Sequence, residues 1–193
     1  MVRVIAGTAG GSKLKTLDTD RTKPTLDRVK EPMFSILAGF IPGANVLDLF
    51  AGSGALGLEA LSRGAAFCRF CDCNPQAAQV VRDNLRHTRL DARASVLAAD
   101  WNTALKQLKE RGEKLDLVLL DPPYAENLYV QVLESLQKYG IIAPECVIMC
   151  EHSRKTELPE EAGVFRVFRR KGYGTVGLTF YMAGMPDDPE EGL

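Results

Sequence analysis

The sequence predicts an α/β fold in which a mostly parallel sheet carries helices on both faces. Short apolar runs alternate with segments of helical periodicity between residues 45 and 151, and such alternation is typical of parallel strands joined by crossover helices. A glycine-rich turn follows the first run, and two runs near the C-terminus predict an antiparallel pair. With 193 residues and 46% apolar composition, the chain is long enough for one domain with a substantial core.

The N-terminal residues predict a small β-hairpin ahead of the main domain. Residues 2–17 alternate loosely between apolar and polar positions, with two glycines between two short runs. From Leu26 apolar residues recur at helical spacing, although Pro32 must kink this helix or delay its start. The predicted divisions are a hairpin and linker over residues 1–25, a main domain over 26–184 and a flexible acidic tail over 185–193.

The first apolar run, residues 45–50, predicts a buried strand that leads into the glycine-rich turn. Gly52 and Gly54 permit a tight turn and a close approach of the backbone to a ligand, and Gly57 lets the next helix lie against the sheet. The polar part of a ligand then rests at the helix N-terminus. Because G-x-G-x-x-G also marks dinucleotide sites, the string leaves both NAD and S-adenosylmethionine open.

Acidic residues at predicted strand ends are candidate contacts to such a cofactor. The second strand ends in Asp72, twenty residues after Gly52, a position from which a carboxylate accepts hydrogen bonds from ribose hydroxyls. Asp48 precedes the first glycine by four residues and suits a cofactor that carries a cationic amino group. Asp100 follows the third strand, where it either accepts from an adenine amino group or caps a helix over residues 101–111.

A second motif follows the apolar run of residues 115–120, which reads as a buried parallel strand ended by two prolines. The Asp121 carboxylate and the backbone carbonyls of Asp121 and Pro122 form a set of acceptors suited to an exocyclic amino group. Pro123 holds the preceding residue extended, and Tyr124 offers a flat face for a base. The alternative is a rigid strand-to-helix turn with Tyr124 packed in the core.

The remaining elements complete the alternation and end in a hairpin with a glycine-containing turn at residues 171–174. The other predicted strands are at about residues 66–72, 93–99, 144–151, 165–168 and 176–182, and the other helices at about 75–87 and 127–139.

Charge is distributed unevenly along a chain whose net charge is −1. Residues 1–30 hold seven bases against three acids, a balance of +4, which predicts a phosphate-contacting arm. A solvated hairpin without a partner is the alternative. The candidate contacts are Arg3, Lys13, Lys15, Arg21 and Lys23.

Composition excludes several classes of protein. Five cysteines without zinc-site spacing indicate core or surface residues, and we expect neither a disulfide framework nor a metal. No run of eighteen apolar residues and no charged leader occurs, so we expect a cytoplasmic protein without a membrane span. The chain has no heptad run, which favours a monomer.

The two motifs together carry a family resemblance. Residues 48–64, with Asp121-Pro122-Pro123-Tyr124, resemble a class I S-adenosylmethionine-dependent methyltransferase acting on an amino nitrogen. Residues 3–7 and 23–31 are similar to the bacterial family that methylates guanine N2 in 16S ribosomal RNA of the small subunit. The resemblance extends from about residue 2 to residue 182.

This resemblance implies a Rossmann-like, seven-stranded sheet and S-adenosylmethionine as the cofactor. It implies ribosomal RNA, or a small-subunit assembly particle, as the partner of the N-terminal hairpin. The catalytic residues it implies are Asp121, Pro122, Pro123 and Tyr124. The cofactor contacts it implies are Asp48, Phe50, Gly52 and Gly54 near the methionine end, Asp72 at the ribose, Asp100 near the adenine, and Thr25 and Arg28 as a cover.

Other functions use similar motifs. An amino methyltransferase acting on DNA adenine, DNA cytosine or protein glutamine would use the same acceptor set, although 193 residues leave no room for an extra DNA target-recognition domain. An NAD-dependent oxidoreductase is allowed by the glycine string and Asp72, but neither histidine lies at a predicted strand end beside the glycine-rich turn.

Overall fold

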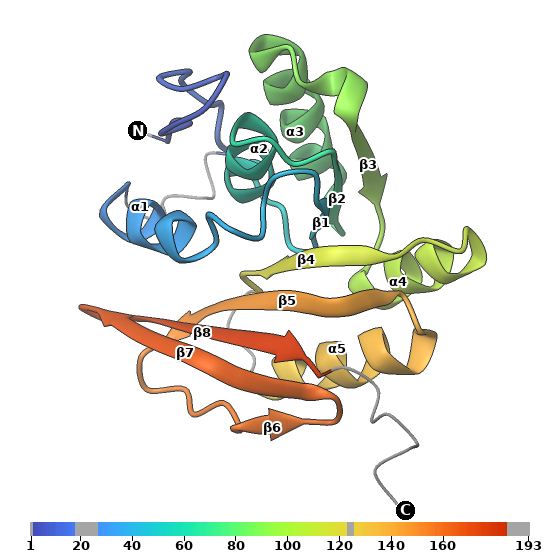
Figure 1. Cartoon of the computed structure of the whole chain (residues 1–193). Coiled ribbons are helices and arrows are strands. Elements are labelled where there is room, and N and C mark those ends of the chain that lie inside the picture. The colour runs from blue at the N-terminus through green and yellow to red at the C-terminus, as the bar shows by residue number, and fades with distance from the viewer. Residues whose placement is uncertain (1, 18–26, 123–125, 185–193) are drawn as a thin grey trace, which may run out of the picture.

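The computed structural model of the chain describes residues 2–17, 27–122 and 126–184, and it confirms the predicted α/β fold (Figure 1). Within these residues one sheet has the order β3-β2-β1-β4-β5-β8-β7-β6. β1 to β5 run parallel, and β8, β7 and β6 continue the sheet in antiparallel fashion. The strands are β1 (Asn45–Asp48), β2 (Phe67–Asp72), β3 (Ala94–Ala98), β4 (Leu115–Leu120), β5 (Ile142–Ser153), β6 (Glu161–Ala162), β7 (Phe165–Tyr173) and β8 (Val176–Ala183).

Helices cover both faces of the sheet, as predicted (Figure 1). Because successive strand residues point to opposite faces, Leu117 and Leu119 of β4 enter one core, whereas Val118 and Leu120 enter the other. The first core includes residues of α1, α2 and α3, and the second includes residues of α4 and α5. The helices are α1 (Asp27–Ile36), α2 (Ala55–Ser62), α3 (Pro75–Thr88), α4 (Trp101–Glu110) and α5 (Glu126–Tyr139), with a 3₁₀ turn η2 (Asp91–Arg93).

Several element boundaries differ from the predicted ones. β6, two residues long, adds an eighth strand to the seven predicted, and it is too short to show a period-two pattern. β1 stops before Phe50 because the chain turns there into the glycine-rich loop. β7 continues past Phe168 to Tyr173, since basic residues on an exposed strand hide its periodicity. Pro32 lies inside α1 and does not delay its start.

The N-terminal segment forms a hairpin-like loop that packs on the main domain. Instead of two regular strands, the segment has one isolated antiparallel bridge, between Arg3 and Lys13. Val4, Ala9 and Leu14 are buried in the same core as α1 and α2. The segment is therefore part of the packed structure, while the predicted linker and the predicted tail 185–193 lie outside the described residues.

Glu59 of α2 anchors this segment. Its buried carboxylate accepts hydrogen bonds from the backbone N–H groups of Ile5, at 2.7 Å, and Ala6, at 3.0 Å. The same carboxylate pairs with the buried Lys30 ammonium at 3.1 Å and with Arg63 Nε at 2.7 Å. Four donors surround one carboxylate, so its negative charge is compensated inside the protein.

A second contact holds the segment against the C-terminal end of α2. Ser62 Oγ accepts from Ala9 N at 2.9 Å, and the Ser62 carbonyl accepts from Thr8 N at 2.9 Å. Gly7 has φ +83°, and a Cβ there would lie 1.9 Å from the Ser62 carbonyl oxygen. The close approach therefore requires glycine.

Three other expectations concern the part of the chain that is described. Cys68, Cys71, Cys146 and Cys150 are buried and Cys73 is exposed, all as free thiols, which agrees with the assignment to core and surface positions. The part of the chain that the structure describes contains no group of three His, Cys, Asp or Glu side chains that could hold a metal. None of the helices in that part is long and apolar enough to cross a membrane.

Candidate active site at the carboxyl edge of the sheet

The predicted motifs follow neighbouring strands. β1 pairs with β2 on one side and with β4 on the other, with Asp48 opposite Leu119. Because all three strands are parallel, the loops after Asp48, Asp72 and Leu120 leave the sheet at the same edge. The strand order reverses direction between β1 and β4, and such switch points are where open α/β sheets bind ligands.

The glycine-rich loop has the geometry that the sequence predicts. Gly52 and Gly54 adopt φ values of +53° and +79°, and Gly54 is the N-cap of α2. A Cβ on Gly57 would lie 2.3 Å from Phe70 Cε1 and 2.8 Å from Cys68 Sγ, so this glycine lets α2 lie directly on β2. A Cβ on Gly52 would meet nothing within 4 Å, which leaves space over the turn for a ligand.

Asp48 lies beneath this loop and is almost fully buried. Its Oδ2 accepts from Gly57 N at 2.9 Å, so the carboxylate also fastens the first turn of α2. Burial raises the pKa of Asp48 to about 7; the Gly57 hydrogen bond opposes this shift and the negative charge of Asp72 adds to it. A cationic group nearby would stabilise the ionised carboxylate.

Asp72 and Asp100 follow the next two strands. Asp72 is half-buried and accepts from Gly52 N and from Asn74 N, each at 2.8 Å, so it links the end of β2 to the glycine-rich loop. Asp100 caps α4 by accepting from Asn102 N at 3.1 Å and Thr103 N at 3.0 Å. Hydrogen bonds from Thr103 are the main cause of its lowered pKa. The N-cap alternative for Asp100 is thus observed, and its adenine contact stays a prediction.

At the end of β4, Asp121 is half-buried and Pro122 is buried. Pro123 and Tyr124 lie outside the described residues, so the predicted aromatic face stays a prediction. The register pairs Leu119 with Met149 and Leu120 with Cys150. Asp121 and Glu151 are the residues that follow this last pair in the two chains.

Glu151 is a candidate site residue that sequence reasoning missed. Its side chain is fully buried, and it lies at the carboxyl edge one strand away from Asp121. The predicted strand 144–151 ended on this acid, directly after an apolar run, which is the signal that was present. A second carboxylate adds hydrogen-bond acceptors to this edge of the sheet.

The remaining predicted contacts are arranged around this edge. Phe50 is half-buried beside the second core, and Arg28 is exposed in the first turn of α1. Arg3, Lys13 and Lys15 are exposed on the N-terminal segment. Thr25, Arg21 and Lys23 lie outside the described residues.

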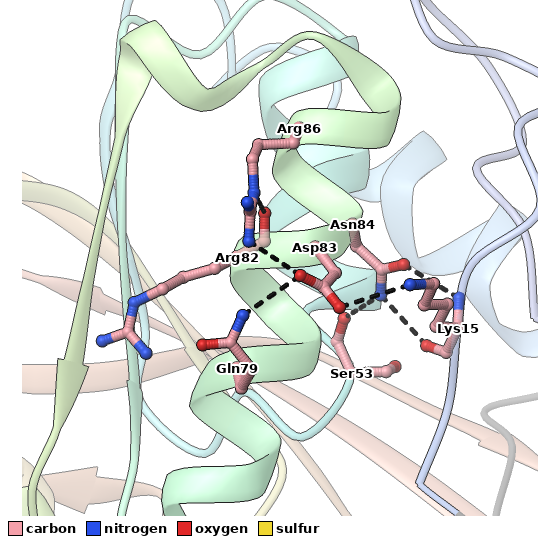
Figure 2. A network of polar contacts seen from close by, with 7 residues as sticks. All are labelled: Lys15, Ser53, Gln79, Arg82, Asp83, Asn84 and Arg86. Atoms are coloured by element: carbon pink, nitrogen blue, oxygen red, sulfur yellow. Dashed lines mark hydrogen bonds and ion pairs between the residues drawn. The ribbon is translucent and has the colours of Figure 1, made fainter.

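Asn84 of α3 connects the N-terminal segment to the glycine-rich loop (Figure 2). Its Oδ1 accepts from Lys15 N at 2.8 Å, and its Nδ2 donates to the Lys15 carbonyl at 3.0 Å and to the Ser53 carbonyl at 2.9 Å. The amide is buried. Sequence reasoning missed Asn84 because its partners lie 69 and 31 positions away in the chain.

The neighbouring Asp83 forms the exposed half of this network (Figure 2). It pairs with Lys15 Nζ at 3.2 Å and Arg86 Nη2 at 2.8 Å, and accepts from Gln79 at 3.1 Å. The hydrogen bond from Lys15 is the main cause of the lowered pKa of Asp83. Lys15, predicted as a phosphate contact, is therefore partly engaged within the protein.

The fold, the glycine-rich loop and the relatives described below together define the chain as a class I methyltransferase, the class that takes its methyl group from S-adenosylmethionine. The residues fit this cofactor, because the Gly52 turn is open above and the Asp72 carboxylate lies at its side. The chain belongs to the family described as Conserved hypothetical protein 95, whose model matches residues 2–182.

Individual relatives carry more specific names. The chain is 38% identical to the putative rRNA methyltransferase YlbH of Bacillus subtilis, over 93% of this chain and 98% of that protein. It is 35% identical to the ribosomal RNA small subunit methyltransferase D of Escherichia coli, over 93% and 89% of the two chains. Among solved structures, the putative methyltransferase yhhF from Escherichia coli superposes with a TM-score of 0.84 at 33% identity, over 95% and 98% of the chains. Family membership sets aside the oxidoreductase alternative.

Proposed function

We propose that the protein transfers a methyl group from S-adenosylmethionine to the exocyclic N2 amino group of a guanine in small-subunit ribosomal RNA. The observation that carries the proposal is the pairing of β1 with β4, which brings the Gly52 turn and Asp121 to one edge of the sheet. The names of the relatives support ribosomal RNA as the substrate, and the sequence resemblance supports guanine N2.

The glycine-rich loop and the acids around it would hold the cofactor. Asp72 would accept from the ribose hydroxyls, and Gly52 and Gly54 would let the backbone approach the methionine part. Asp48 would stabilise the cationic amino group, and Asp100 would lie near the adenine. Phe50 would add an apolar contact, and Thr25 and Arg28 would cover the site. When bound, S-adenosylmethionine supplies a methyl group on a positively charged sulfur, which is a strong electrophile.

Asp121 and Pro122 would hold the nucleophile. The guanine N2 group has two N–H donors, and the Asp121 carboxylate and the Pro122 carbonyl are acceptors, so together they fix the direction of the nitrogen lone pair. Such alignment contributes about 7–11 kcal/mol toward lowering a reaction barrier. The proton that the amine releases leaves to the Asp121 carboxylate or to water.

The base must leave its stack to reach this edge. Turning a nucleotide out costs a few kcal/mol, and stacking on an aromatic side chain such as Tyr124 offsets roughly 1–3 kcal/mol of it. Guanine in a loop or a partly assembled particle is the least costly target, because fewer stacking contacts are lost.

A substrate panel tests this function against its alternatives. Purified protein is incubated with tritiated S-adenosylmethionine and, separately, with small-subunit ribosomal RNA, duplex DNA or total protein from cells lacking this gene. We expect label only in the RNA, as N2-methylguanosine after digestion to nucleosides. Label in N6-methyladenine, N4-methylcytosine or methylglutamine would identify an alternative acceptor and overturn the proposal.

A further inference from the structure

We propose that a cavity beside the catalytic edge binds a backbone phosphate of the RNA substrate, next to the target nucleotide. This inference rests on the proposed function. The cavity has a volume of about 460 Å³ and lies between the end of β5, the following loop and the β7–β8 hairpin. Side chains that line it include His152, Arg154, Glu157, Glu160, Arg170 and Lys171.

The cavity lies at the same edge of the sheet as the proposed amine site. β4 and β5 are parallel neighbours, and β5 pairs with β8, so the end of β5 and the β7–β8 turn lie on the side where β4 leads into Asp121 (Figure 1). With strands spaced about 4.8 Å apart, β8 lies about 10 Å from β4 within the sheet.

The floor of the cavity is a fixed chain of hydrogen bonds. The His152 ring is buried, with Nδ1 2.8 Å from the Ser153 carbonyl and Nε2 2.8 Å from Thr179 Oγ1. Because a carbonyl only accepts, Nδ1 carries a proton, and Nε2 lies within hydrogen-bond distance of the Thr179 hydroxyl. Gly177 is required here, since a Cβ would lie 2.5 Å from His152 Cε1.

Arg170 is held in place above this floor. Its Nη1 donates to Thr179 Oγ1 at 3.3 Å, and its Nη2 donates to the Leu158 carbonyl at 2.7 Å. Nε and Nη2 also bind Glu160 Oε1, at 3.1 and 2.8 Å, so the charge of Glu160 is engaged by Arg170. These bonds use four of the five N–H groups of the guanidinium, so Arg170 shapes the cavity and the charge for an anion comes from other side chains.

The rim carries the positive charge that remains for a ligand. Arg154 and Lys171 are exposed, and within the described residues neither forms an ion pair. The Arg154 guanidinium crosses Gly172, where a Cβ would lie 3.1 Å from Arg154 Nε. Glu157 is the exposed acid that opposes these bases.

The charge of this region contrasts with that of the whole chain. Residues 154–173 hold six bases and three acids, a balance of +3 in a protein whose net charge is −1. Positive charge concentrated around a cavity attracts anions. On a nucleic-acid-modifying enzyme, beside the amine site, the anion that fits this position is a phosphodiester of the substrate backbone.

The test removes the rim charges and measures RNA binding as a function of salt. The double variant Arg154→Ala, Lys171→Ala is compared with wild type and with the control Lys106→Ala, Arg111→Ala, which removes equal charge from exposed positions on and after α4. For a single-stranded fragment of small-subunit RNA, we expect the slope of log affinity against log salt to fall by about 1.4, from two contacts of about 0.7 each. The control keeps the wild-type slope.

Two further measurements sharpen the test. The rim double variant should raise the KM for RNA at least fivefold with kcat and S-adenosylhomocysteine affinity unchanged, because it removes uniform binding. Glu157→Gln should strengthen RNA binding, because it removes the negative charge that opposes these bases. Both sets of substitutions are at exposed positions, and unchanged melting temperatures verify the fold.

The outcomes separate this inference from the proposed function. A rim variant with the slope and KM of the control overturns the phosphate site while leaving methyl transfer to RNA intact. The melting temperatures of wild type and the rim variant are also measured with inorganic phosphate. If phosphate stabilises wild type but not the rim variant, while RNA binding is the same in both, the cavity is a site for free phosphate and the inference is also overturned. A wild-type protein that neither binds nor methylates ribosomal RNA contradicts the proposed function itself.

Discussion

Gly57 and Asp48 fix the start of α2 over the sheet in two different ways. Gly57 provides the space for contact with Phe70, and Asp48 accepts from the Gly57 N–H. The sequence predicted the role of Gly57, because a glycine at this spacing after a strand is a local signal. It did not show that Asp48 binds the backbone of Gly57, since that contact depends on how closely α2 approaches β1.

Substituting Gly57 by alanine should displace α2. The new Cβ meets Phe70 and Cys68 within 3 Å, and such overpacking costs about 1–3 kcal/mol of stability. We expect a lower melting temperature and weaker binding of S-adenosylhomocysteine, measured by thermal denaturation and calorimetry. Gly39→Ala is the matched control, because a Cβ at Gly39 meets nothing within 4 Å. Equal stability of the two variants would refute the packing account.

Asp48 should make stability depend on pH. Its pKa is raised from 3.8 to about 7 in the folded protein, so between these values the folded state binds more protons than the unfolded state. Stability attributable to Asp48 therefore falls as pH rises from about 4 to about 7, by on the order of 1 kcal/mol per pH unit, and levels off above. Comparing the free energies of unfolding of wild type and Asp48→Asn across pH 4–8 measures this. Parallel curves for the two proteins would contradict it.

At the scale of elements, the contact between the N-terminal segment and α3 joins the predicted RNA-facing arm to the cofactor loop. Asn84 binds Lys15 and Ser53 together, and Glu59 binds Ile5 and Ala6 to α2. The strands and helices were predictable because apolar periodicity is local. These anchors were not, because Ile5 and Ala6 lie 54 and 53 positions away from Glu59 in the chain.

Substituting Asn84 by alanine should loosen the N-terminal segment and the glycine-rich loop at the same time. Three hydrogen bonds of a buried amide are lost (Figure 2), and each partner left without a bond costs about 1–3 kcal/mol. We expect a lower melting temperature and a weaker affinity for S-adenosylhomocysteine, since the Ser53 carbonyl belongs to the loop. Asp83→Ala, which removes the exposed neighbouring ion pairs and the hydrogen bond from Gln79, serves as the control. Equal cofactor affinity in wild type and Asn84→Ala would show that the arm and the loop are independent.

Glu59 gives a second prediction for the same segment. Glu59→Ala removes the buried carboxylate that pairs with the Lys30 ammonium, and breaking a buried ion pair typically costs about 3–5 kcal/mol. It also releases the N–H groups of Ile5 and Ala6. We expect faster hydrogen exchange at these two amides than in wild type. Unchanged exchange would mean that the core contacts of Val4 hold the segment without Glu59.

At the scale of the whole molecule, one edge of the sheet gathers the groups that the sequence distributes over more than a hundred residues. Asp72, the glycine-rich loop, Asp121 and Glu151 lie at the carboxyl ends of the parallel strands β2, β1, β4 and β5, in that order. The sequence predicted this common edge because strand ends with polar residues are recognisable and parallel topology is implied by alternation. The cavity beside the β7–β8 hairpin was not predictable, because it depends on where this hairpin lies beside β5.

At this scale, the charged residues are distributed unevenly over the surface, which the net charge of the chain does not show. A chain with net charge −1 presents exposed bases on its N-terminal segment and around the β7–β8 hairpin. Both surfaces carry the sign that phosphates require, and the catalytic edge between β1 and β4 holds carboxylates suited to amino groups.

The central claim is that the β1 loop holds the cofactor while the end of β4 holds the amine. We test it with Asp121→Ala, by measuring tritiated methyl transfer to small-subunit ribosomal RNA and S-adenosylhomocysteine affinity on the same preparation. The account predicts a loss of transfer of about 10²–10³-fold with nearly unchanged cofactor affinity, whereas Asp72→Ala weakens cofactor binding. Wild-type transfer by Asp121→Ala, or an equal loss of cofactor affinity, would contradict it.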